Sequence, residues 1–505
     1  MDLHGSSRLT ECPDFTTTPH LERLYLSFCE SLRGIHPSIG VLRKLTILDL
    51  RSCIKLTSFP KSFGHLTSLK WLVLSSCLKL TSLPDCFGNM KCLEELDLTD
   101  SVVAELPASI VHLTALTSLR LSACKNLRRL PKGIGALKDL KTLFLTDCVK
   151  LDKLPEDFDD MGSSVQLYVQ RTAIRKVTFL DYLNYGESVE LRGCRHIKPD
   201  SFGSSIRRYS FCSPGKNITA LFLNGCHLRW IPQDICLLHS LWYLNLGLND
   251  FEYLPASMVQ LSELSTLFLY GCDRLQQLPE LSSSLSYLVA DNCKSLRTIC
   301  NPLVYTAINR FSFLNCSQLV ESNLLSERLI LNPFRVSNLL ISSFKYWKCI
   351  TPGCEIPKWF SHQNRMGSSI SFQLPLDCCN DNLLGLLVCF VFEATDRGPQ
   401  QSRMEIKGWS QECYFIHGNI RGQRTGDNVF LFALKYDASL TNGREIKIQP
   451  KNLVNIKVKK CGAHLLYKDD PIFSCLKSND RGRNNNKKIP SSSNCDEDFS
   501  IGQVI

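Results

Sequence analysis

The first 300 residues repeat one order of apolar and polar positions, mostly in steps of 24 or 23 residues and once in a step of 21. Each block follows the pattern L-x-x-L-x-L-x-x-C-x-x-L-x-x-L-P-x-x-[IF]-x-x-L. The part L-x-x-L-x-L places leucines on one side of a short strand, and the alternate positions face the other way. One such strand cannot bury its apolar side alone, so we expect the copies to stack into a parallel sheet over one continuous core. The blocks begin at Leu21, Leu45, Leu69, Leu93, Leu116, Leu140, Ile218, Leu241, Leu264 and Leu285.

A proline in the second part of most blocks marks where the chain turns away from the strand. Proline fixes φ and lacks an N–H group, so it suits the outer, convex side, where no ladder hydrogen bond is lost. A period of about 20–29 residues with this leucine pattern is that of a leucine-rich repeat. The sequence therefore predicts an α/β solenoid, a horseshoe with a parallel sheet on its concave side. The prolines stand at positions 60, 84, 107, 131, 155, 232, 255 and 279.

The chain has 25 cysteines, and most of those before residue 320 take one position, third after the last leucine of the strand segment. Leucine-rich repeats hold a small side chain there, inside the coil, and a free cysteine behaves as a small apolar residue. The alternative is a ladder of metal-binding or redox-active thiols, but Ser101 and Asn249 take the same position in two blocks. Buried free thiols indicate a reducing compartment. The cysteines are Cys29, Cys53, Cys77, Cys124, Cys148, Cys226, Cys272 and Cys293, with Cys194 and Cys316 in less regular blocks.

The repeat is irregular at residues 165–217. VQLYVQRTAIRKV and VELRGCRHI read as shortened blocks, and the stretch up to Asn217 reads as an insertion. Such a break either bends the solenoid or presents a loop. The alternative is a drifted repeat without a function of its own, because loops tolerate insertions readily.

The repeat fades after about residue 301. Phe311, Phe313, Cys316 and Leu319 fit one last imperfect coil, and residues 326–347 are predicted to form a capping helix or a connection.

From Thr351 the apolar period changes to two. SISFQL, LLGLLVCFVF and NVFLFAL are apolar or alternating runs separated by Gly, Asn and Asp, which is typical of an all-β sandwich. Trp359 and Phe360 follow Pro357 and are predicted to anchor a core rather than to bind a ligand. We therefore divide the chain into a leucine-rich-repeat solenoid (1–320), a connecting or capping segment (321–350), a β-sandwich (351–468) and a disordered polar tail (469–505).

The outward strand positions of the solenoid line its concave face and are the candidate protein-binding site. The later blocks place Phe and Tyr there, and exposed aromatic side chains are the usual material of binding hot spots. The alternative is that these rings pack against one another and stabilise the sheet. Asn245 and Asp291 are also expected to face outward. The candidate residues are Trp71, Arg120, Phe144, Tyr168, Phe222, Tyr243, Phe268, Tyr270 and Tyr287.

The first residues contain no recognisable cap. Residues 2–20 resemble the end of a repeat, and an open solenoid end exposes apolar side chains. We therefore expect another domain or a partner in trans to cover Leu21, Leu24 and Leu26.

Three segments resemble plant intracellular immune receptors that carry a TIR domain, a nucleotide-binding domain and a leucine-rich repeat. LTECPDFTTTPHLERLYLSFCESLRGIHPSIG (Leu9–Gly40) is similar to the opening of their repeat region. TPGCEIPKWFSHQNRMGSSISFQLP (Thr351–Pro375) and VKKCGAHLLY (Val458–Tyr467) are similar to the two ends of their domain after the repeats. The resemblance implies that this last domain, called C-JID, is a jelly-roll-like β-sandwich.

The resemblance implies a protein-recognition module in plant defence. Its expected partners are a pathogen effector or a guarded host protein, and the TIR and nucleotide-binding domains of a receptor. The alternative is a stand-alone adaptor or decoy that pairs with full-length receptors. In such receptors nucleotide switching and NAD cleavage belong to the TIR and nucleotide-binding domains, so neither activity is assigned here.

Searching the sequence for catalytic motifs gives no G-x-x-x-x-G-K-[ST] loop, no nucleophile elbow and no H-E-x-x-H pair. We therefore expect no enzyme, no cofactor and no metal. A net charge of +10 without a basic stripe carrying stacking aromatics does not indicate a nucleic-acid site. The first fifteen residues contain no apolar core of signal-peptide length, and no apolar run in the sequence reaches the length of a membrane span. Both observations favour the cytoplasm, with the nucleus as a second location.

Overall fold

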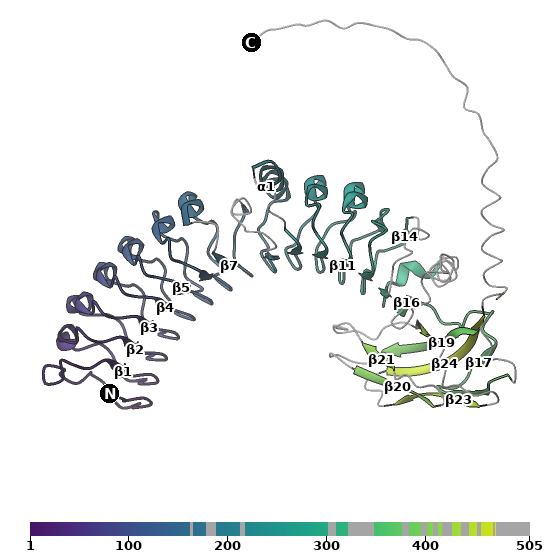
Figure 1. The fold of residues 1–505 in the computed structure, drawn as a ribbon, viewed down its shortest axis with the longest axis horizontal. Helices are drawn as coiled ribbons and strands as arrows, with labels where there is room; N and C mark the ends of the chain where they lie inside the picture. The colour runs from purple at the N-terminus through teal and green to yellow at the C-terminus, as the bar shows by residue number, and fades with distance from the viewer. Residues whose placement is uncertain are drawn as a thin grey trace, which may run out of the picture.

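Short strands stack side by side into an arc, helical turns line the outer side of the arc, and a β-rich domain adjoins its far end (Figure 1). This computed structural model confirms the predicted solenoid followed by a β-sandwich. It describes residues 1–161, 165–177, 188–212, 218–300, 310–321, 348–375, 383–394, 401–407, 413–416, 427–435, 444–451, 456–467 and 470.

Each coil contributes one short strand to a parallel sheet on the concave side. The strands pair in register, so that Leu24 lies beside Leu48, Leu48 beside Leu72 and Leu72 beside Leu96. The first sheet holds β1 (Arg23–Tyr25), β2 (Ile47–Asp49), β3 (Trp71–Val73), β4 (Glu95–Asp97), β5 (Ser118–Arg120), β6 (Thr142–Phe144) and β7 (Gln166–Tyr168). The second continues with β8 (Ser188–Glu190), β9 (Ala220–Phe222), β10 (Tyr243–Asn245), β11 (Thr266–Phe268), β13 (Tyr287–Val289) and β15 (Arg310–Ser312). A smaller pair, β12 (Gln277–Leu278) and β14 (Thr298–Ile299), lies apart from both.

The leucines at the start of the blocks occupy equivalent buried positions in neighbouring coils. Leu45, Leu69 and Leu116 are fully buried, and Leu140 is 2% exposed. Stacking therefore removes from water the apolar side that a single strand would leave exposed.

The cysteine position forms a ladder of buried thiols. Each Sγ donates a hydrogen bond to a backbone carbonyl of the preceding coil, as from Cys53 to Leu26 at 3.2 Å and from Cys148 to Leu121 at 3.1 Å. Asn249 makes the same contact with its amide, to the carbonyl of Leu223 at 2.9 Å. The same hydrogen bond is made by Cys29, Cys77, Cys124, Cys194, Cys226, Cys272, Cys293 and Cys316.

The prolines introduce short 3₁₀ helices on the convex side, as their positions predict. Pro60, Pro84, Pro107, Pro232 and Pro255 are each the extended residue directly before such a helix. The 3₁₀ helices are η1 (Pro37–Val41), η2 (Lys61–His65), η3 (Asp85–Asn89), η4 (Ala108–His112), η5 (Ile134–Ala136), η6 (Glu156–Met161), η8 (Gln233–Leu237), η9 (Ala256–Gln260) and η11 (Ser317–Glu321).

Another domain or a partner was expected to cover Leu21, Leu24 and Leu26. That expectation is wrong for Leu24 and Leu26, because the chain's own first residues lie over them, and Leu21 packs partly buried against the same core. The amide of Leu3 donates to the carbonyl of Tyr25 at 2.8 Å, and Phe15 is fully buried. Leu24 and Leu26 are both fully buried as a result. The residues that resembled the end of a repeat thus build a coil of their own.

The irregular region contains ordinary coils and one α-helix. The amide of Arg171 donates to the carbonyl of Arg192 at 2.8 Å, so the coils of β7 and β8 are neighbours although their strands belong to different sheets. The stretch expected to be an insertion is mostly α1 (Pro199–Cys212), which stands on the convex side among the 3₁₀ helices (Figure 1). Its residues Phe202 and Ile206 are fully buried in the solenoid core.

One strand joins the solenoid sheet to the sandwich. β16 (Lys348–Pro352) pairs in parallel with β15 and antiparallel with β22 (Asn428–Lys435). The amide of Phe313 donates to the carbonyl of Ile350 at 2.8 Å, and the amide of Asn315 donates to the Asn428 side chain at 3.1 Å. The helix or connection predicted for residues 326–347 lies outside the described residues.

The sandwich consists of two antiparallel layers. One is the end of the long sheet, in the order β17-β24-β19-β22-β16, and the other has the order β18-β23-β20-β21. Their facing residues, among them Ile370, Phe390 and Ile448, form one apolar core. The strands are β17 (His362–Asn364), β18 (Ile370–Gln373), β19 (Leu383–Ala394), β20 (Gln401–Lys407), β21 (Cys413–Ile416), β23 (Glu445–Lys451) and β24 (Ile456–Tyr467).

β19 is buried on both faces, which explains why its sequence is apolar without alternation. Phe390 and Phe392 belong to the sandwich core, whereas Cys389 and Val391 pack with the solenoid core. The segment thus forms a strand of the sandwich, as its apolar sequence predicts. No helix in the described part of the chain is long and apolar enough to cross a membrane.

Phe360 is buried in a core, as predicted, and is 3% exposed. It packs with the core that continues from the solenoid, not between the two layers of the sandwich. Its neighbour Trp359 is partly buried and packs its ring against that of His464, with centroids 5.4 Å apart. His464 holds this loop in place: its Nδ1 lies 2.9 Å from the Ser361 hydroxyl, and its Nε2 lies 2.9 Å from Asp470 Oδ2. The tail beyond Asp470, predicted to be disordered, lies outside the described residues.

Replacing one stacked leucine should destabilise the solenoid strongly. Leu121→Ala is expected to lower the free energy of unfolding by ~2–5 kcal/mol, because it leaves a cavity in a fully buried site. Urea unfolding followed by circular dichroism measures the loss. Arg128→Ala, at an exposed position of the same coil, should change stability by less than about 0.5 kcal/mol. Equal effects of the two substitutions would contradict the stacking.

Alkaline pH should destabilise the fold through the thiol ladder. Burial raises the pKa of Cys77 from its ordinary value of 9.0 to about 12, and burial raises the pKa of Cys53, Cys148 and Cys226 as well. Above pH 9 the unfolded chain releases thiol protons that the folded chain retains, so stability falls as pH rises. Thermal melting between pH 7 and pH 10 tests this dependence. Flat stability across that range would mean that the thiols are not desolvated.

Candidate protein-binding surface

The nine candidate residues all lie on the concave side, on a strand or directly after one. None of them is fully buried, and Arg120 is exposed. The structure divides them into a long run from β9 to β13, a pair on β6 and β7 with Arg120 beside it, and Trp71 by itself. We call the long run the aromatic strip; it consists of Phe222, Tyr243, Phe268, Tyr270 and Tyr287.

The aromatic strip is a continuous zigzag across four neighbouring strands. The ring centroids of Phe222 and Tyr243 are 4.8 Å apart, those of Tyr243 and Phe268 are 5.6 Å apart, and those of Phe268 and Tyr287 are 5.5 Å apart. The interplanar angles lie between 38° and 50°, so the rings are tilted rather than stacked face to face. Each ring is partly exposed.

Alternation of large and small residues produces the zigzag. Tyr243 has Ala220 and Thr266 as its partners in the sheet register, and Phe268 has Asn245 and Val289. Each aromatic ring therefore leans over a smaller neighbour and meets the next ring along a diagonal. The sequence shows this alternation only once the strands are aligned.

The Tyr270 ring lies against the backbone of Gly247 in the preceding coil. A Cβ atom at Gly247 would lie 2.7 Å from the Tyr270 ring, closer than such contacts occur. The ring also meets Phe268 edge to face at 6.4 Å. Gly247 is therefore a supporting residue that a search for exposed aromatics does not find.

Arginines lie over both ends of the aromatic strip, and the sequence pattern alone did not predict them. The guanidinium of Arg192 lies 4.3 Å from the Phe222 ring centroid, and that of Arg310 lies 5.0 Å from the Tyr287 ring centroid. A signal was present, because Arg192 follows Leu191 as Tyr270 follows Leu269 in a later block. Cation–π contacts of this kind add specificity to an otherwise apolar surface.

The hydroxyls of Tyr243 and Tyr287 stay neutral. Burial raises the pKa of Tyr243 and of Tyr287 above the ordinary value of 10.0. Both hydroxyls therefore remain able to donate and accept hydrogen bonds at physiological pH.

The other candidates lie nearer the first coils. Phe144 and Tyr168 stack at 4.6 Å with an angle of 7° between their planes, and Arg120 lies 5.1 Å from the Phe144 centroid. The Lys70 ammonium lies 5.9 Å from the centroid of the Trp71 ring. A hydrogen-bonded chain from Thr146 through Gln170 to Glu190 separates the pair from the aromatic strip.

Two residues expected to face outward are buried instead. Asp291 is 4% exposed, and its Oδ1 accepts hydrogen bonds from the Ser312 hydroxyl at 2.5 Å and the Leu314 amide at 2.9 Å. Asn245 is 8% exposed and accepts from the Gly247 amide at 3.1 Å. Burial raises the pKa of Asp291. Both side chains satisfy backbone groups at turns, and neither is available to a partner.

This surface has the chemistry of recognition: apolar rings, neutral hydroxyls and flanking cations. In the described residues no group of three or more His, Cys, Asp or Glu side chains is placed to hold a metal ion.

Gly247→Ala should displace the Tyr270 ring, because the added methyl group has no space beneath it. A crystal structure of the variant tests this directly. Gly34→Ala is the matched control, since a Cβ at Gly34 meets nothing within 4 Å. An unmoved Tyr270 ring in Gly247→Ala would contradict the supporting role.

Two family models match the chain: a leucine-rich repeat region over residues 19–121 and a C-JID domain over residues 351–472. The Disease resistance-like protein DSC1 of Arabidopsis thaliana is 30% identical, over 66% of this chain and 31% of its own length. The TMV resistance protein N of Nicotiana glutinosa is 31% identical, over 94% of this chain and 43% of its own length. The chain thus spans less than half the length of these relatives. It is a leucine-rich repeat region followed by a C-JID domain, two non-catalytic binding modules, and is homologous to this part of the plant TIR-NB-LRR disease resistance proteins.

Proposed function

We propose that this chain is the recognition part of a plant immune receptor and binds a pathogen effector, or a host protein that the receptor guards, through the aromatic strip. The observation that carries the proposal is a run of five partly exposed aromatic side chains on adjoining strands. Exposed Tyr and Phe with neighbouring Arg supply contact area at low entropic cost and are enriched in hot spots.

The adjoining edge of the sandwich extends the proposed surface. β13, β15 and β16 are successive strands of one sheet, so Tyr287 lies two strands from the start of the sandwich. A partner seated on the aromatic strip therefore meets the sandwich without a hinge between them. An interface of standard size, about 800 Å² on each partner, needs more area than five rings provide.

In a full-length receptor, binding at this surface would be linked to TIR and nucleotide-binding domains in the cytoplasm, with the nucleus as a second location. This part of the proposal follows from the relatives. The adaptor or decoy alternative rested on an open first coil, and residues 2–15 cover Leu24 and Leu26, so no observation now favours it.

The test is a binding screen with the chain fused to a matching TIR and nucleotide-binding half, using candidate effectors and co-purification as the readout. For a partner found in this way, Phe268→Ala combined with Tyr270→Ala should weaken binding by roughly 2–4 kcal/mol, as truncation of hot-spot residues does. Leu78→Ala is the control, because Leu78 is 48% exposed on a turn outside the aromatic strip. Isothermal titration measures the three dissociation constants.

Two outcomes would count against the proposal. One is that no candidate effector or host protein binds the fused receptor. The other is that the double variant binds as tightly as the unchanged chain and loses only thermal stability, which would make the aromatic strip a structural feature of the sheet.

A further inference from the structure

A second aromatic site lies beside α1, at one repeat position that other coils keep polar. The residue two places before the convex-side proline is Trp230 in one coil and Tyr253 in the next, and these side chains are 47% and 54% exposed. In six other coils the residue at this position is not aromatic, so the coil does not need an aromatic side chain there in order to fold. Their residues are Ser58, Ser82, Glu105, Arg129, Lys153 and Gln277.

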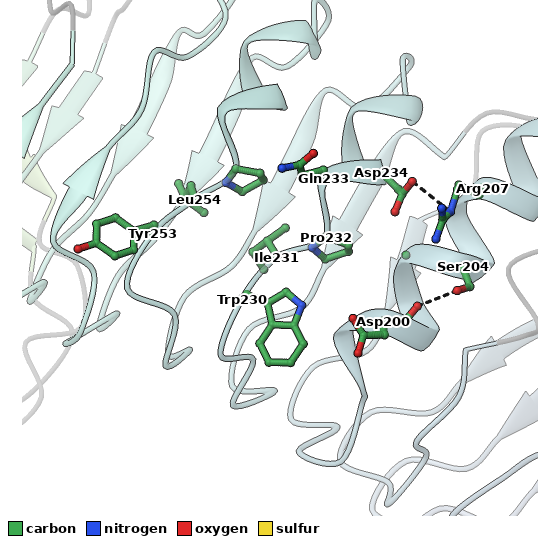
Figure 2. Close-up of a pocket in the computed structure, with 12 residues that line it drawn as sticks. Asp200, Ser204, Arg207, Trp230, Ile231, Pro232, Gln233, Asp234, Tyr253 and Leu254 are labelled. Carbon is green, nitrogen blue, oxygen red and sulfur yellow. Dashed lines mark hydrogen bonds and ion pairs between the residues drawn. The ribbon is translucent and has the colours of Figure 1, made fainter. Parts of the chain in front are cut away.

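The two aromatics border a groove of about 470 Å³. Figure 2 shows Trp230 between Tyr253 on one side and the α1 residues Asp200, Ser204 and Arg207 on the other. The volume falls within the usual range of ligand-binding clefts, about 300–1,000 Å³. The groove exists because α1 takes the place of a 3₁₀ helix in this coil and forms its second wall.

The groove walls are fixed in the folded chain. Gly203 lets α1 approach the next coil, since a Cβ there would lie 2.9 Å from both Pro232 Cβ and Asp234 Oδ2. An ion pair between Arg207 and Asp234 at 3.2 Å holds the two coils together. The Tyr253 hydroxyl donates to Gln276 Oε1 at 3.0 Å, which fixes the ring. A ligand would therefore find the groove already formed.

The charge in the groove is opposite to that of the whole chain. Asp234 is compensated by Arg207, whereas the exposed carboxylate of Asp200 has no cationic partner among the described residues. With two carboxylates and one guanidinium, the groove lining carries a charge of −1 on a chain of net charge +10. An exposed indole beside an uncompensated carboxylate favours a cation, which the ring face and the carboxylate both attract.

We propose that this groove binds a lysine- or arginine-bearing segment of a partner protein, with the cation over Trp230 and against Asp200. Tyr253 and the groove's prolines contact the apolar residues on either side of that cation. This site is separate from the aromatic strip and does not depend on the function proposed for it. A receptor part with two such sites can hold a second protein while the concave face remains free.

The experiment measures fluorescence anisotropy of a short labelled peptide of alternating arginine and proline, titrated with the full chain. Saturable binding is expected. Trp230→Ser should weaken binding at least about fivefold, the size of a partly desolvated cation–π contact. Tyr253→Ser should also weaken binding, because it removes apolar contact with the residues beside the cation. Serine is chosen because Ser58 and Ser82 occupy this position in other coils, so the variants should fold, which their melting curves check.

Two further variants separate the causes. Asp200→Asn should also weaken binding several-fold, because it removes the negative charge and keeps the shape. Trp242→Ser is the matched control: Trp242 is 48% exposed but packs against Tyr243, outside the groove, and its loss should leave peptide binding unchanged.

The proposal is overturned if the arginine peptide does not saturate, or if Trp230→Ser and Tyr253→Ser bind it as well as the unchanged chain does. It is also overturned if the same peptide with glutamate in place of arginine binds equally. Binding that requires Trp230 but is unaffected by Asp200→Asn would reject the cationic ligand.

Discussion

The structure depends on the stacking of one coil on the next, because no coil can bury its own leucines. Neighbouring coils are held together by backbone hydrogen bonds between parallel strands. In most coils a thiol also donates to a carbonyl of the preceding coil, and in one coil the Asn249 amide does so instead. Both contacts fix the register: a slip by one residue would turn the leucines toward solvent. The same register therefore determines both the apolar core and the positions of the concave side chains. The rings of the aromatic strip meet because this register is kept from β9 to β13.

That constraint explains which parts of the structure the sequence predicts. A block repeated many times determines the strand, the buried leucine, the thiol and the proline turn in every regular coil, and Leu45 and Leu140 occupy equivalent positions accordingly. The outward positions follow from alternation within the strand, so the candidate aromatics were placed on the correct face. Whether these residues bind a partner remains a prediction, because pattern and geometry establish exposure and contact, not affinity.

What the sequence does not predict arises where the repeat meets something else. Asp291 follows the alternation, yet the Ser312 hydroxyl and the Leu314 amide turn its carboxylate inward near the junction with the sandwich. Gly247 has no side chain, so the pattern of exposed aromatic residues does not indicate its role, although it determines where the Tyr270 ring lies. The coil formed by residues 2–15 departs from the leucine pattern, and its role is visible only in the hydrogen bonds it makes with the next coil. Long-range pairing of β16 with both β15 and β22 has no local signature either.

Joining the solenoid and the sandwich through β16 is the central structural claim, because it makes the concave face and the sandwich a single continuous surface. Hydrogen–deuterium exchange of individual backbone amides tests it most directly. The amide of Phe313, bonded to Ile350 across the junction at 2.8 Å, should exchange as slowly as the amide of Leu246, bonded to Phe268 at 2.8 Å within the solenoid. Rapid exchange at Phe313 with Leu246 still protected would show that the junction opens independently and would contradict the account.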